Sequence, residues 1–371
     1  MSAGFVRSGA QAQPLGQSER GPLLHPPSLL RPGRNPGAAL AEGLRMSLLP
    51  PCGGLPAAGH ARFVHTPVMV REVTELFAPV PAGVVLDATV GAGGHARALL
   101  GALPAARLVG LDRDPDAVAA AREALSPFGD RATVLLARFD RLAEVLAELG
   151  IESLAGALFD LGVSSPQLER PERGFSYRSE GPLDMRMGPD AGQSASDLVN
   201  FAPAEALAEL FALHGEARFA RRIAAAVVAA RPLQSTLQLA EVVASAVPVP
   251  ARRRGHPAKR VFQALRAAVN SELEVLPVAL DAAIGLLKPG GRIVVISYHS
   301  GEDRLTKARF LLGETGGCTC PPGLPCVCGA APTLHVLTRG ARKASREERA
   351  ANPRSESARL RAAERRRDGS G

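Results

Sequence analysis

Asp87 and Asp112 each end a short apolar run of the sequence, VVLD and LVGLD. A glycine-rich turn, GAGG, follows the first run and leads into residues that suit a helix. Glycine lets the backbone approach a ligand closely and adopt positive φ without a Cβ clash. A carboxylate about 20 residues beyond such a turn can accept hydrogen bonds from ribose hydroxyls. The spacing therefore predicts a binding site for a nucleoside-containing cofactor.

Two kinds of cofactor use a turn of this type. A dinucleotide places its pyrophosphate at the helix N-terminus, and GAGGHA fits a loose form of the dinucleotide pattern. S-adenosylmethionine has no phosphate but carries an ammonium and a sulfonium group. Asp87 lies just before the turn, where its charge would repel a pyrophosphate and attract a cation, so we favour S-adenosylmethionine. An NAD-dependent oxidoreductase and a turn that binds nothing are the alternatives.

These residues must be positioned by an alternation of strands and helices. We expect strands at residues 84–87, 107–112, 132–137, 154–160, 292–299 and 333–340, the last at a sheet edge, with helical patterns between the first four. Such an alternation predicts an α/β fold with a doubly wound parallel sheet. Asp160 ends the fourth apolar run. Because the carboxyl ends of parallel strands bound the ligand crevice, it is expected at the same site.

The alternation breaks after the fourth strand. We expect the α/β domain to comprise residues 63–164 and 266–340, interrupted by a helical insertion at 165–265 that recognises the substrate. Residues 1–62 are rich in Pro, Gly, Ser and Arg and poor in acids, which predicts a disordered extension. A transit peptide or an early start codon would also explain them. The Arg-rich stretch 341–371 is interpreted as a basic tail, either a terminal helix on RNA or solvated surface.

Composition narrows the class of protein. A net charge of +8 suits a polyanionic partner, although it also suits plain solubility. No apolar run is long enough to span a bilayer, so no membrane partner is expected. Five cysteines, four of them in one short stretch, do not form a disulfide scaffold, and a cytoplasmic location is the default. A homodimer is left open.

Cys318, Cys320, Cys326 and Cys328 form a C-x-C-x5-C-x-C pattern. Four thiolates could make a tetrahedral zinc site. However, the C-x-C spacing is tighter than the usual C-x2-C, and prolines stiffen the loop between the pairs. A structural zinc therefore stays open. We assign no metal to the active site, because displacement at a sulfonium needs no Lewis acid.

Several stretches together resemble the bacterial 16S ribosomal RNA (cytosine-N4)-methyltransferase family. They are HTPVMVREV, DATVGAGGH, LDRDP, FDLGVSSPQLERPERGFSYRSEGPLDMRM, HGEARFARRIAAAV, HPAKRVFQALRAAVNSEL, KPGGRIVVISYHSGEDR and NPRSESARLRAAER. The resemblance covers essentially all of residues 65–365, and its most specific part runs from Asp160 to Met187. It implies a class I methyltransferase fold with a helical insertion. It also implies methyl transfer from S-adenosylmethionine to the exocyclic amine of one cytidine in the decoding region of small-subunit ribosomal RNA.

The resemblance also implies a set of cofactor contacts. Carried over residue by residue, they are Gly93, Gly94, His95, Asp112, Phe139, Asp160 and Gln167. The reasoning from the residues themselves agrees for the glycines, Asp112 and Asp160. An aromatic ring at Phe139 could face the adenine or pack in the core, and His95 could contact the methionine end or begin a helix. The assignment of Gln167 depends on the resemblance alone.

Asp160 is also the hypothesis for the catalytic acceptor, with the backbone carbonyls of 161–164 as further acceptors. Its alternative role is to hold the cofactor only. Two groups of residues are candidate RNA contacts, and surface charge alone would also explain them, the second group better than the first. The first group is Arg170, Arg173, Phe175, Tyr177, Arg178 and Arg186; the second is Arg252, Arg253, Arg254, His256, Lys259 and Arg260.

Three departures from the family pattern qualify the resemblance. The first 60-odd residues have no expected counterpart, HSGEDR replaces the more usual HSLEDR, and DLGVSSP stands where other N4-methyltransferases have Asp-Pro-Pro-Tyr. The last of these weakens the assignment of the acceptor. A methyltransferase with another substrate and a non-catalytic RNA-binding assembly factor are the remaining alternatives.

Overall fold

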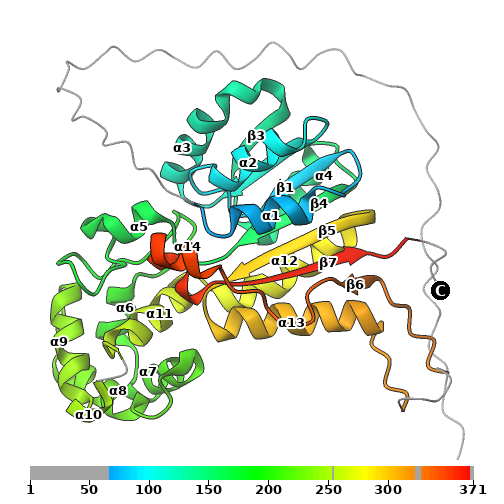
Figure 1. Cartoon of the computed structure of the whole chain (residues 1–371). Helices are drawn as coiled ribbons and strands as arrows, with labels where there is room; N and C mark the ends of the chain where they lie inside the picture. The colour runs from blue at the N-terminus through cyan, green and yellow to red at the C-terminus, as the bar shows by residue number, and fades with distance from the viewer. Residues whose placement is uncertain (1–66, 253–254, 322–326, 368–371) are drawn as a thin grey trace, which may run out of the picture. The chain divides into compact units, whose positions relative to one another are not determined.

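The computed structural model describes residues 67–252, 255–321 and 327–367 (Figure 1). The chain divides into two compact units, 1–61 and 62–371, and all described residues belong to the second. The predicted disordered extension, the start of the first resemblance stretch at His65, and the candidate residues Arg253, Arg254 and Cys326 lie outside the described ranges.

One sheet of seven strands organises the described chain. Its strands are β1 (Val84–Asp87), β2 (Arg107–Asp112), β3 (Ala132–Leu136), β4 (Leu154–Asp160), β5 (Leu287–Ser297), β6 (Leu334–Val336) and β7 (Arg359–Arg365). Their order is β3-β2-β1-β4-β5-β7-β6. β1 to β5 are parallel, whereas β7 is antiparallel to both of its neighbours. The predicted doubly wound α/β fold is confirmed.

Helices cover both faces of this sheet. One face packs against α1 (Val70–Phe77), α2 (Gly94–Ala102) and α3 (Pro115–Leu125). The other face packs against α4 (Leu142–Glu148), α12 (Glu272–Leu286) and α13 (Ser300–Thr315). A strand covered on both sides can be apolar at every position. Six of the seven residues of β4, Leu154 to Phe159, are buried, so only its last residue, Asp160, is partly accessible.

The segment after β4 forms mostly helices. They are α5 (Ser165–Glu169), α6 (Ala195–Phe201), α7 (Ala204–Phe211), α8 (Ala220–Ala229), α9 (Thr236–Ala246), α10 (Val249–Arg252) and α11 (Ala258–Val269). α6 to α11 gather together in Figure 1. They share a hydrophobic cluster, running from Phe175 to Val269, that is separate from the two clusters on the sheet. Ser194 and Ser235 begin two of these helices with capping boxes. The division of the chain into an α/β domain and an inserted helical subdomain stays a prediction.

The C-terminal part of the chain differs from the sequence-based expectation. Neither a terminal helix nor a solvated tail describes Arg359–Arg365, which is strand β7 in the sheet. Leu360, Ala362 and Ala363 are fully buried, and Arg361 donates to Asp303 Oδ1 on α13 at 2.7 Å. A short helix, α14 (Arg346–Ala351), precedes the strand. The predicted edge strand is present as β6, but the last strand is β7, and it lies between β5 and β6.

Candidate active site

The strand order predicts a ligand-binding crevice at the carboxyl edge of the sheet. β1 pairs with β2 on one side and with β4 on the other. From β1 the chain adds β2 and β3 in one direction, and it then adds β4 and β5 in the other direction. The boundary between β1 and β4 is therefore a topological switch point. Doubly wound sheets bind ligands at such points. Asp87, Asp112 and Asp160 end the three strands concerned, and the structure thus brings the predicted carboxylates to one edge.

The glycine turn is shaped by close backbone packing on one side and space on the other. Gly91 and Gly93 have φ of 51° and 82°, the left-handed region that favours glycine. A Cβ at Gly94 would lie 2.3 Å from Pro67 Cγ, so that side of the turn is closed. A Cβ at Gly91 would meet nothing closer than the Thr89 carbonyl oxygen at 3.9 Å. The room beside Gly91 fits a cofactor that approaches the backbone.

Asp112 and Asp87 differ in their surroundings. Asp112 accepts hydrogen bonds from the backbone N–H of Gly91 and of Asp114, both at 2.9 Å, while burial raises its pKa to about 6. Burial also raises the pKa of Asp87 to about 7; the charges of Asp160 and Asp112 add to this, and His95 opposes it. Neighbouring carboxyl groups disfavour one another's ionisation. The site is therefore suited to a cationic ligand.

Asp160 is held by hydrogen bonds from two directions. The Tyr298 hydroxyl donates to its Oδ1 at 2.8 Å, and its backbone N–H donates to Thr89 Oγ1 at 2.7 Å. His95 Nδ1 lies 3.5 Å from Asp160 Oδ2, and His95 Nε2 lies 2.8 Å from the carbonyl oxygen of Val68. These contacts fix the carboxylate and the imidazole side by side in the crevice.

Tyr298 and Thr89 were missed by the sequence analysis, although a signal was present. Thr89 lies two residues after β1 and Tyr298 directly after β5, so the carboxyl-end rule applies to them as it does to Asp160. Gly162, with φ of 107°, allows the Tyr298 ring to approach, because a Cβ there would lie 3.2 Å from the ring.

Two predicted cofactor contacts have clear protein partners. Phe139 is partly buried, and its ring meets that of Phe159 edge-on at 5.9 Å. Gln167 is buried; its Nε2 donates to Asp114 Oδ2 at 2.9 Å and its Oε1 accepts from the Ser164 N–H at 3.0 Å. Gln167 thus fastens the loop after β4 to the start of α3. Contact of either residue with the cofactor stays a prediction.

The first group of candidate RNA residues is largely occupied by protein contacts. Arg173 pairs with Asp114 at 3.0 Å, Arg170 pairs with Asp116, and Arg186 lies 2.6 Å from Asp184. Phe175 is buried in the hydrophobic cluster of the helices that follow β4. These residues order the loop.

Tyr177 and Arg178 are placed differently. The Tyr177 ring stacks on His256 with centroids 5.0 Å apart, and the guanidinium of Arg178 lies 5.5 Å from the Tyr177 ring. The structure thus brings the two predicted groups together at one place. Arg178, His256 and Lys259 are exposed there, whereas Arg260 lies 3.1 Å from Glu216. The other described member, Arg252, donates to the Val247 carbonyl at 2.9 Å.

A family model described as the MraW methylase family matches residues 62–366. The chain belongs to the MraW methylase family. As a member of this family it is a methyltransferase, and its methyl donor is S-adenosylmethionine, as the carboxylate-flanked glycine turn predicted. Within the described ranges, no helix combines the length and apolar character needed to cross a membrane.

Relatives in the MraW methylase family are similar over most of their length. Ribosomal RNA small subunit methyltransferase H of Thermobifida fusca is 52% identical over 312 residues, covering 82% of this chain and 94% of that protein. The protein of the same name from Mycobacterium bovis is 47% identical over 355 residues, covering 90% and 89%. That alignment extends into the first 66 residues, so the expectation that this stretch has no counterpart is wrong in part. A solved rRNA methylase from Streptococcus thermophilus is 11% identical over 80% of this chain and 96% of that one, with a TM-score of 0.37.

Proposed function

We propose that this chain methylates the exocyclic N4 amine of one cytidine in the decoding region of 16S ribosomal RNA, within the small ribosomal subunit. The similar proteins described above are named as ribosomal RNA small subunit methyltransferases, which supports the substrate class. The single observation that carries the chemistry is the placement of Asp160 at the switch point, oriented by Tyr298.

Bound S-adenosylmethionine supplies a methyl carbon on a positively charged sulfur, which a nucleophile can displace in line. The residues of the chain position the reactants. Gly91 leaves room for the cofactor beside the protein backbone. Asp112 is placed to accept hydrogen bonds from the ribose hydroxyls of the cofactor. The negative charge of Asp87 favours the cationic end of the cofactor.

The cytosine amine is a weak nucleophile, because its lone pair is delocalised into the ring. A hydrogen bond from the amine to the Asp160 carboxylate would turn the nitrogen toward tetrahedral geometry and free the lone pair. As the N–C bond forms, the S–C bond breaks and the nitrogen gains a positive charge. It then loses one proton, for which Asp160 is the acceptor. Tyr298 and His95 hold this carboxylate in place.

The target base has to leave its stack to reach the crevice. Aromatic rings and arginine can hold an unpaired nucleotide. Tyr177, Arg178 and His256 offer such groups, and they support the insertion as the surface that receives the RNA.

The test of the proposed function is nucleoside mass spectrometry of 16S ribosomal RNA from cells with and without this protein. N4-methylated cytidine should be lost without the protein and restored when purified protein, donor and small subunits are mixed. Restoration of a different methylated base would replace the proposed substrate. A protein that binds subunits and donor but transfers no methyl group would be an assembly factor.

Replacing Asp160 by Asn tests its role as the acceptor. An amide cannot take up the proton, so kcat should fall by about 100-fold or more while the Kd for the donor changes by less than about 10-fold. Asp130→Asn, at an exposed position, is the matched control and should leave both unchanged. Equal losses in kcat and donor affinity would show that Asp160 only holds the cofactor.

A further inference from the structure

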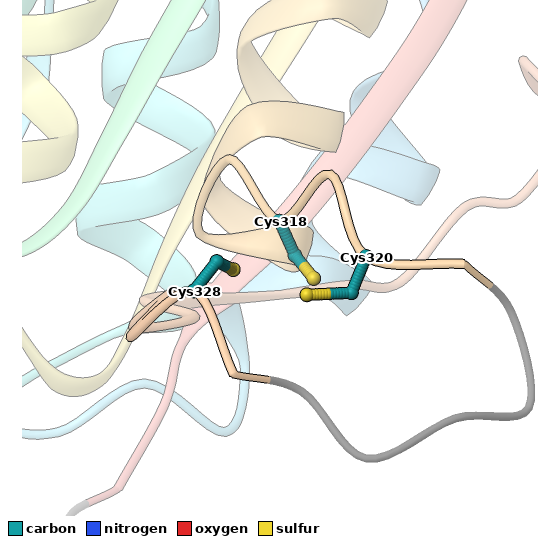
Figure 2. A group of neighbouring side chains, drawn as sticks. All are labelled: Cys318, Cys320 and Cys328. Carbon is teal, nitrogen blue, oxygen red and sulfur yellow. The ribbon is translucent and has the colours of Figure 1, made fainter.

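The loop between α13 and β6 brings three cysteines together. The sulfur atoms of Cys318, Cys320 and Cys328 all lie within 4.8 Å of one another. Figure 2 shows that the three side chains point toward a common centre, Cys318 and Cys320 from one arm of the loop and Cys328 from the other.

Apolar packing does not explain this arrangement. None of the described residues in the range 317–333 is buried, and Val327 is 88% exposed. The base of the loop is held by the backbone: the Thr333 N–H donates to the Gly313 carbonyl at 2.7 Å, and a Cβ at Gly316 would lie 2.5 Å from the Ala331 carbonyl carbon. Beyond that base, no described residue of the loop contributes a buried side chain that would hold the three sulfur atoms together.

We propose that Cys318, Cys320 and Cys328 bind a structural zinc ion. Thiolates at about 2.3 Å from a tetrahedral zinc lie about 3.8 Å apart, which small side-chain rotations here can reach. Soft thiolate ligands select zinc over magnesium or calcium.

A second group of ligand-type side chains is engaged by protein partners. Glu272, His299 and Glu302 also lie close together, but Arg266 donates to both carboxylate oxygens of Glu272 at 2.8 Å. His299 Nδ1 accepts from the Gly301 N–H at the start of α13. The carboxylate of Glu272 is thus neutralised by a protein side chain.

The position of the loop makes the zinc structural. α13 has 16 residues and begins just after Tyr298, so its far end lies about 24 Å away along the helix axis. The zinc would close the connection that leads from this end to the edge strand β6. It would take no part in methyl transfer.

The direct test uses the full-length chain and zinc alone. Reduced, metal-free protein is titrated with Zn²⁺ against a chromophoric chelator, and the protection of each cysteine from alkylation is read by peptide mass spectrometry. About one zinc should bind per chain, and Cys318, Cys320 and Cys328 should become at least about 10-fold less reactive. Single Cys→Ser variants at these positions should weaken zinc binding by at least about 10-fold, whereas Cys52→Ser should not.

Three outcomes would overturn the proposal. They are no zinc binding by the wild-type chain, zinc binding that leaves the three cysteines reactive, and a disulfide among them in protein kept under reducing conditions. Donor affinity of the Cys→Ser variants should stay unchanged, because the loop lies far from the crevice. This readout separates loss of the metal from loss of the fold, and it does not depend on which base is methylated.

Discussion

At the scale of single residues, charge at the crevice is the dominant feature. Asp87, Asp112 and Asp160 interact through space, and burial raises the pKa of Asp87 to about 7 and that of Asp112 to about 6. Ionising such a group costs free energy that a bound cation can offset. Near neutral pH, the negative charges of the ligand-free site therefore raise its free energy. A bound sulfonium donor lowers it by placing a positive charge beside them.

This raised pKa predicts a dependence of stability on pH. The ordinary pKa of an Asp is 3.8 and that of folded Asp87 is about 7, so between these values the folded state holds a proton that the unfolded state has lost. Stability contributed by Asp87 is therefore present at low pH and is lost as pH rises through about 7. The thermal midpoint of the ligand-free protein is measured at about pH 5 and at about pH 7.5. Between these two values of pH, the midpoint should fall more in wild type than in Asp87→Asn.

Asp130→Asn serves as the control, since this exposed residue should leave the pH dependence as in wild type. An Asp87→Asn variant with the full wild-type pH dependence would contradict the assignment. The donor should bind wild type more tightly as pH rises over the same range, with release of a proton.

Sequence reasoning succeeded for residues whose position follows from one strand end. Asp87, Asp112 and Asp160 belong to that class. It did not foresee that Arg170 and Arg173 would pair with acids at the start of α3, because Asp114 and Asp116 are more than 50 residues away and no local pattern links them. Composition alone favoured these arginines as RNA contacts, because it does not reveal their partners Asp114 and Asp116.

At the scale of elements, the start of α2 depends on one missing Cβ. Gly94→Ala should destabilise the protein by about 2 kcal/mol or more and weaken donor binding, because the new methyl group would overlap Pro67 at 2.3 Å. Gly101→Ala lies in the same helix with nothing within 4 Å of the new atom, and it should stabilise by up to about 1 kcal/mol. Chemical denaturation and donor titration measure both. Equal effects of the two substitutions would contradict the packing argument.

β7 shows why one element escaped prediction. Its sequence, RLRAAER, is typical of charged surface, yet Arg359 and Arg361 both contact Asp303 on α13. The apolar residues Leu360, Ala362 and Ala363 are buried. An arginine side chain can be partly buried next to a hydrophobic core when a carboxylate forms an ion pair with it. Since that carboxylate belongs to a distant helix, hydrophobic periodicity alone could not reveal the strand.

Removal of β7 should therefore unfold the sheet. A chain ending at Ala358 leaves β5 with an unpaired edge and uncovers its apolar side chains. We expect insoluble protein or a thermal midpoint lower by at least about 10 °C. A chain ending at Arg367 keeps the strand and should match wild type in thermal midpoint and donor affinity. A stable, donor-binding protein that lacks Arg359–Arg365 would show that β7 is dispensable.

At the scale of the whole molecule, the net charge of +8 does not say where RNA binds. The binding surface depends on which cationic side chains are exposed. Arg178 and Lys259 are exposed beside the stacked pair Tyr177 and His256. Replacing both cations by Ala should weaken RNA binding and reduce the slope of log Kd against log salt by roughly one per cation. Arg71 and Arg141, exposed on the α/β domain, give a control with the same change in net charge. Equal losses from both pairs would mean that charge alone, not this surface, binds the RNA.

The position of β7 also bears on the order in which the protein is made. This strand leaves the ribosome after β5 and β6, yet it is inserted between them. During synthesis one edge of β5 therefore stays unpaired, and the sheet is complete only once residues 359–365 have emerged from the ribosome. A nascent chain stalled before that point should recruit chaperones, which makes the late strand a checkpoint for release of active enzyme.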